Sequence, residues 1–247
     1  MTRWKAAAIH FSISVCVGIA AAALIFGVWY PPPYSHAVGA DQLILLLLGV
    51  DVVLGPLLTL VVFKSGKKSL RFDLTVIALL QVCAFLYGMS VVVRARPAFI
   101  VGRVDRFVIV SANDLDDEDF EKATNPQFRS APWTGPKVIG AAVPTDTQLR
   151  NEVLFSSTNG KDLEKFPQYY TDYDAVAPTL LQYAKPLSDL EKSKPESRSV
   201  IADVLARRKL RDEDVVWVPL DARRASMTML LDRSSGQPLQ AIAVDPW

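Results

Sequence analysis

A single carboxylate, Asp51, interrupts the apolar stretch LLLLGVDVVLGPLLTLVVF, residues 45–63, and Gly55 and Pro56 follow it closely. A charge in the middle of a lipid-crossing helix costs about 2.5–3.5 kcal/mol on insertion scales, so such an acid is expected to be protonated or paired and to face protein. Three kinds of chemistry are open to it. It can form a hydrogen bond that fixes local helix packing, meet a polar group on a helix of another protein, or serve a proton or ion path.

The surroundings of Asp51 suggest which groups it meets. The nearest polar side chains expected at its depth are Tyr87 and Gln81, each about a helical turn away on a later apolar segment. Proline has no N–H, so Pro56 deprives the carbonyl of Val52 of its helical donor and predicts a kink. Small residues such as glycine let another helix approach closely. The candidate partner-binding residues are therefore Asp51, Gly55, Pro56, Gly49 and Tyr87.

Other kinds of chemistry find little support in the sequence. Residues 97–247 contain no histidine and no cysteine. This excludes a Ser-His-Asp triad, a cysteine nucleophile and a His/Cys zinc site in that region. The acid-rich segment 114–123 lacks the glycine and spacing of an EF-hand and predicts the start of a capped helix. We expect no catalytic residue, no metal, no cofactor and no small-molecule substrate.

Three long apolar runs place Asp51 in a membrane. Residues 6–29 and 74–93 carry no charged side chain, and residues 42–63 carry only Asp51. A bilayer core of about 30 Å needs about 20 helical residues. The sequence thus predicts a domain of three transmembrane helices over residues 1–96, with the lipid bilayer as one partner.

The charges of the loops predict the orientation of these helices. Arg3 and Lys5 precede the first helix, and residues 64–71 between the second and third carry four Lys or Arg. The first loop, residues 30–41, carries none. Because positive residues stay on the cytoplasmic side, the amino terminus is expected in the cytoplasm and the carboxyl-terminal domain outside it.

Residues 97–247 predict an α+β domain with a mainly antiparallel sheet, since strands and helices alternate without a regular βαβ rhythm. Strands are expected over 98–102, 106–111, 138–143, 215–220, 226–232 and 239–244, and helices over 114–123, 146–155, 176–184 and 197–208. A hairpin turn is expected at DRSSGQP, residues 232–238. The domain has a net charge of −4, which argues against nucleic acid as a partner.

Several segments of the sequence resemble one family. GVDVVLGPLLTL, LRFDLTVIALLQ, RARPAFIVGRVDRFVIV and the closing AVDPW are similar to the type IV pilin accessory proteins of the TfpX/TfpY/TfpZ type, also called fimbrial assembly proteins. The resemblance is strong over residues 3–112, looser through the middle, and returns at the carboxyl terminus. The positions that match the motifs are Asp51, Gly55, Pro56, Asp73, Arg96, Pro97, Asp105 and Arg106.

The resemblance implies a bacterial inner-membrane protein with a periplasmic domain. It would act as a chaperone that binds the type IV major pilin, both its transmembrane helix and its head, and promotes pilus assembly and twitching motility. Two alternatives stay open at this point: an accessory factor in covalent pilin modification such as glycosylation, and a membrane sensor or transporter component. The absence of catalytic motifs favours the chaperone, which is not an enzyme.

Overall fold

The computed structural model describes residues 2–247, apart from the side chain of Leu43. The chain forms two compact units. The first runs from the amino terminus to Pro31 and continues over Ala40–Ala95. The second comprises Pro32–Gly39 and Arg96–Trp247, so the short loop after the first helix belongs to the carboxyl-terminal unit.

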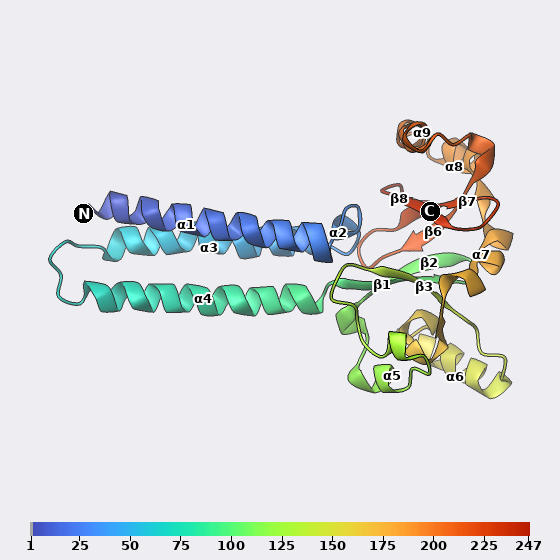
Figure 1. Ribbon diagram of the computed structural model, residues 1–247, viewed down its shortest axis with the longest axis horizontal. Helices are drawn as coiled ribbons and strands as arrows, with labels where there is room; N and C mark the ends of the chain where they lie inside the picture. Colours follow the sequence, from blue (N-terminus) through green and yellow to red (C-terminus); the bar gives the residue numbers. More distant parts are fainter. Residues whose placement is uncertain (1) are drawn as a thin grey trace. The chain divides into compact units, whose positions relative to one another are not determined.

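The first unit consists of three long helices (Figure 1). They are α1 (Arg3–Leu24), which a π-helical turn η1 (Ile25–Trp29) extends, α3 (Ala40–Val62) and α4 (Leu70–Arg94). The side chain of Thr2 caps α1 by accepting a hydrogen bond from the backbone N–H of Lys5. All three helices are long and apolar enough to cross a membrane, as the sequence predicts.

Helix α3 lies between α1 and α4 and packs against both (Figure 1). Near one end of the unit the hydroxyl of Tyr30 donates a 2.7 Å hydrogen bond to the carbonyl of Val92. On α4, Gly88 lies close against Leu47 of α3, because a Cβ there would come within 2.2 Å of Cδ1 and that side chain would have to shift. A glycine thus permits close approach of α4 to α3, as small residues do in membrane helix pairs.

The loop between the first two long helices folds into the second unit. It contains the short helix α2 (Tyr34–Ala37), and Ala37 is buried in the same hydrophobic cluster as Phe107 and Leu220. The carbonyl of Ala37 accepts backbone hydrogen bonds from Arg224 and Ala225 at 3.0 and 3.2 Å. Because they pack together, this loop and the carboxyl-terminal domain must lie on the same side of a membrane that the helices cross.

The second unit is built on an eight-stranded sheet with the order β4-β3-β1-β2-β6-β7-β8, and β5 pairs with β6 outside this path. Five of the seven strand pairs are antiparallel and two, β1 with β3 and β2 with β6, are parallel. This confirms the predicted α+β class with a mainly antiparallel sheet. The strands are β1 (Pro97–Arg103), β2 (Arg106–Ser111), β3 (Lys137–Ala141), β4 (Tyr170–Thr171), β5 (Lys185–Pro186), β6 (Val215–Asp221), β7 (Met227–Asp232) and β8 (Pro238–Ile242).

Both faces of this sheet are covered. Successive side chains of a strand point to opposite faces, and in β1 Ile100 belongs to one cluster while Phe99 and Val101 belong to another. Helix α7 (Ala177–Tyr183) covers the first face, where Leu180 is fully buried. On the other face lie buried residues of α5 (Asp117–Glu121), α6 (Thr147–Ser157), α8 (Leu187–Ser193) and α9 (Ser197–Arg208).

Most of the predicted elements are present, with two differences among the α-helices. The acidic segment expected to form one helix over 114–123 is divided into a 3-10 turn η2 (Ala112–Asp114) and α5, each with its own capping box. The pairs Ser111 with Asp114 and Asp116 with Asp119 each form the reciprocal cap that starts a helix, so two short helices begin where one was expected. Helix α8 was not expected, because Pro186 suggested only the end of the preceding helix, although proline also favours the start of the next one.

Candidate functional site

Asp51 lies at the middle of α3, the twelfth of its 23 residues. At 1.5 Å per residue this is about 17 Å from either end, deeper than the sequence suggested because α3 begins earlier than expected. The Oδ2 atom of Asp51 is buried and has no hydrogen-bond partner in the structure. A buried polar atom without a partner costs free energy whether the carboxyl group is charged or neutral.

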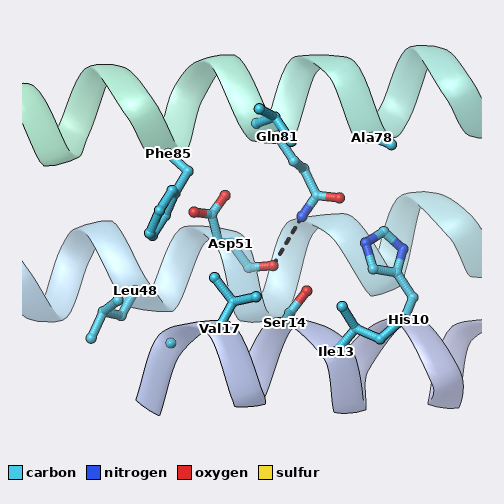
Figure 2. Close-up of a pocket in the computed structure, with 11 residues that line it drawn as sticks. His10, Ile13, Ser14, Val17, Leu48, Asp51, Ala78, Gln81 and Phe85 are labelled. Atoms are coloured by element: carbon cyan, nitrogen blue, oxygen red, sulfur yellow. Dashed lines mark hydrogen bonds between the residues drawn. The ribbon is translucent and has the colours of Figure 1, made fainter. Parts of the chain in front are cut away.

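Gln81 of α4 is the polar neighbour of Asp51, one of the two that the sequence indicated. Its amide Nε2 donates a 3.2 Å hydrogen bond to the backbone carbonyl of Asp51, not to the carboxyl group. Figure 2 shows the Asp51 carboxyl pointing toward α4 and the Gln81 amide oxygen pointing away from it. That oxygen, Oε1, is also buried without a partner. The middle of the helical unit therefore contains two unpaired polar atoms, one on Asp51 of α3 and one on Gln81 of α4.

Asp51 and Gln81 line a groove on α1, α3 and α4, and Figure 2 shows the ribbon of α3 between those of the other two helices. The part beside Asp51 has a volume of about 220 Å³, and a second part of about 340 Å³ adjoins it, sharing His10, Ile13 and Ala78. We call this the α1–α4 groove. Its lining is apolar except for a few residues, which are His10, Ser14, Asp51, Thr59 and Gln81.

Three of these polar residues were not among the candidates from the sequence. His10 and Ser14 are four residues apart, so they share one face of α1. The Nδ1 atom of His10 and the hydroxyl of Thr59 on α3 are 2.6 Å apart, a hydrogen bond that links the two helices. The sequence did contain a signal for these residues, since isolated polar side chains occur at helical spacing within an apolar run.

Tyr87, the other polar residue that the sequence indicated near Asp51, lies beside a different hollow of the helical unit from Gln81. Its side chain is 74% exposed. It borders a second cavity of about 370 Å³ on α3 and α4, where Asp51 also contributes. Asp51 thus lies between two hollows of the helical unit, with Gln81 bordering one and Tyr87 the other.

The small residues around Asp51 have separate roles. A Cβ on Gly55 would lie 2.0 Å from Nε2 of Gln81, so the glycine makes room for the Gln81 amide. A Cβ on Gly49 would meet nothing within 4 Å. Helix α3 continues through Pro56. The amide of Gln81 donates to the backbone carbonyl of Asp51. The Val52 carbonyl, which Pro56 was expected to leave without its helical donor, belongs to the next residue.

Gly55→Ala is expected to destabilise the helical unit, because the new methyl group displaces the Gln81 amide and breaks its bond to α3. An interhelical hydrogen bond in a membrane contributes about 0.6–1.7 kcal/mol, so the thermal midpoint of the detergent-solubilised protein should fall by a few degrees. Gly49→Ala is the matched control and should keep or slightly raise the midpoint, since alanine favours helix over glycine. Equal midpoints for the two variants would contradict this role of Gly55.

Two motif residues of the second unit, Asp105 and Arg106, form an ion cluster with Asp221 beside the ring of Trp247. Arg106 contacts Asp105 and Asp221, each at 2.9 Å, and its guanidinium lies 5.3 Å from the ring centre of Trp247. The hydrogen bond from Arg106 holds the pKa of Asp105 below its usual value. The motifs VDRF and DPW, far apart in sequence, thus meet, and their arrangement fixes the end of the chain to the sheet.

No group of three or more His, Cys, Asp or Glu side chains placed to hold a metal ion is found within residues 2–247. The polar cluster of the helical unit is suited to hydrogen bonding within a membrane. The helical unit and the sheet domain together define the class of protein: a three-helix membrane protein that carries an α+β domain.

Comparison with known proteins identifies the family. Residues 1–39 match the family model described as fimbrial assembly protein FimB. A fimbrial assembly protein of serogroup E1 from Dichelobacter nodosus is 30% identical over 98% of this chain and 95% of its own length. The serogroup I protein of that organism is 29% identical over the same shares, and the protein of serogroups C1 and C2 is 40% identical over 45% of this chain and 86% of its own. The chain belongs to the fimbrial assembly protein family, which confirms the resemblance in its sequence. No solved structure matches it.

Proposed function

We propose that this protein is an inner-membrane chaperone that binds type IV pilin subunits and promotes their assembly into fimbriae without covalent chemistry. Membership of the family supports a role in fimbrial assembly. The observation that carries the more specific proposal is the pair of buried, unpaired polar atoms on Asp51 and Gln81 at the centre of the helical unit. Such atoms are costly in a membrane unless a partner supplies hydrogen bonds.

The two units of this chain correspond to the two parts of a pilin subunit. A pilin in a membrane is one apolar helix with a globular head, so a chaperone for it needs membrane helices and a domain on the side of the head. The helical unit supplies the first and the sheet domain the second. That domain and the loop Pro32–Gly39 share one core, which keeps them on one side.

The test of this function is deletion of the gene in a bacterium that makes type IV fimbriae. Surface fimbriae and twitching motility should fall, while the intact mass of the remaining subunit stays that of wild type. A changed subunit mass would instead support an accessory role in pilin modification. Unchanged fimbriae and mass with altered transcript levels would support a sensor, and either result would overturn the chaperone.

The orientation of the protein gives a further prediction. Reporter fusions after Lys68 should indicate the cytoplasm, and fusions after Gly135 or at Trp247 should indicate the periplasm, because the Lys- and Arg-rich loop remains inside. The measurements are the activity of alkaline phosphatase fusions and the fluorescence of green fluorescent protein fusions at the same positions. A cytoplasmic signal at Trp247 would place the sheet domain and the pilin head on opposite sides of the membrane.

A further inference from the structure

The α1–α4 groove is long enough to hold a helix. Its two parts are continuous through shared residues, and it extends along α1 from Ala6 to Gly18. Twelve residues of helix rise about 18 Å, which is more than half of a bilayer core of about 30 Å. Small side chains occur along it, with Ala6, Ser14 and Gly18 on α1 and Ala78 on α4. Small residues are the usual lining where one membrane helix packs closely against another.

The polar residues Asp51 and Gln81, which line the groove, decide between a lipid and a helix as its occupant. Gln81 Oε1 is an acceptor and needs a donor. Asp51 Oδ2 needs an acceptor or a donor, according to whether the carboxyl group is protonated. An acyl chain offers neither. A hydroxyl or carboxamide side chain both donates and accepts, so it satisfies either state of Asp51 as well as Gln81.

We propose that the α1–α4 groove holds the single transmembrane helix of the fimbrial subunit, and that this helix presents a hydroxyl or carboxamide side chain to Asp51 and Gln81. This inference rests on the proposed function and adds the surface and the chemistry of recognition. On binding, the two side chains turn toward the occupant and both polar atoms become paired, while apolar side chains fill the groove. Release of the subunit to a growing fimbria leaves them unpaired again, so the free protein favours taking up another subunit.

Photo-crosslinking in intact membranes tests the surface. A photoreactive residue replaces Val17 or Val82, which line the groove, or Ile19 or Leu80, which are exposed on the opposite sides of α1 and α4. We expect crosslinks to the subunit from Val17 and Val82, and at least tenfold fewer from Ile19 and Leu80. Equal crosslinking from all four positions, or groove crosslinks only to lipid or to a second copy of this chain, would overturn the inference.

The proposed function has a separate readout in the same samples. If the subunit co-purifies with the protein but does not crosslink from the groove, the function stands and the groove inference fails. If no subunit co-purifies and none crosslinks at any position, both fail.

Gln81→Met tests the chemistry, because methionine has similar length without a donor or a strong acceptor. Loss of one interhelical hydrogen bond of about 0.6–1.7 kcal/mol corresponds to a roughly three- to twentyfold lower recovery of the subunit. Leu80→Met on the lipid-facing side is the control and should recover as much subunit as wild type. Wild-type recovery with Gln81→Met, at equal protein levels, would overturn the requirement for a polar side chain.

Discussion

Asp51→Leu is expected to abolish recovery of the fimbrial subunit with this protein, while the level of the protein in the membrane stays the same or rises. Leucine removes the cost of an acid at the centre of α3, about 2.5–3.5 kcal/mol on insertion scales, so the variant should insert at least as well as wild type. It also removes the carboxyl group from the groove. The measurement is co-purification of the subunit in mild detergent, normalised to the amount of this protein.

Two further variants separate recognition from packing in this experiment. Asp51→Asn keeps a donor and an acceptor without a charge, so recovery should weaken but persist. Pro56→Ala restores the helical N–H without touching the carboxyl group and should leave recovery near wild type. Equal recovery of the subunit with Asp51→Leu and with wild type would show that Asp51 has only a structural role within α3.

Ala37→Asp is expected to unfold the sheet domain or to lower its free energy of unfolding by at least about 3 kcal/mol. The side chain of Ala37 is 1% exposed, among residues such as Phe107, Leu220 and Met227. A carboxylate there would be removed from water among apolar side chains, and burial of a charge without full compensation is strongly destabilising. The loss is a large share of the 5–15 kcal/mol that stabilises an ordinary domain.

Protease resistance of the domain in membrane vesicles measures this effect. His36→Asp is the matched control, because the neighbouring side chain is exposed, and it should resist protease far better than Ala37→Asp does. If the two variants resisted equally, the loop Pro32–Gly39 would not be part of the domain core.

The sequence was sufficient to predict the three long helices and most of the sheet. Apolar runs of 20 or more residues have few alternatives to a membrane helix. Strands β6 and β7 and helix α9 were clear because apolar side chains recur there in unbroken or helical patterns. The two-residue strands β4 and β5 were missed, since so short a pairing has no periodicity of its own. The place of loop Pro32–Gly39 in the second core depends on contacts far apart in sequence, which no local pattern reveals.

The sequence predicted the residue at the centre of the candidate site, Asp51, but not most of the residues around it. Asp51 stood out as a charge in an apolar run, and helix depth alone indicated Gln81. Which face of α4 met α3 could not be inferred, so Tyr87 was given a place equal to that of Gln81. The close fit of Gly55 against Gln81 and the bond between His10 and Thr59 depend on the rotation of each helix about its axis. That rotation is set by packing and not by any single segment.

The most direct test of the chaperone account is to isolate the wild-type protein from membranes in mild detergent and to determine the intact mass of whatever elutes with it. The account predicts a stable complex that contains the fimbrial subunit at the same mass as the subunit in the whole membrane. Absence of the subunit, under conditions where the protein itself stays folded, would contradict the claim that it holds subunits in the membrane. A bound subunit of altered mass would contradict the claim that it does so without covalent chemistry.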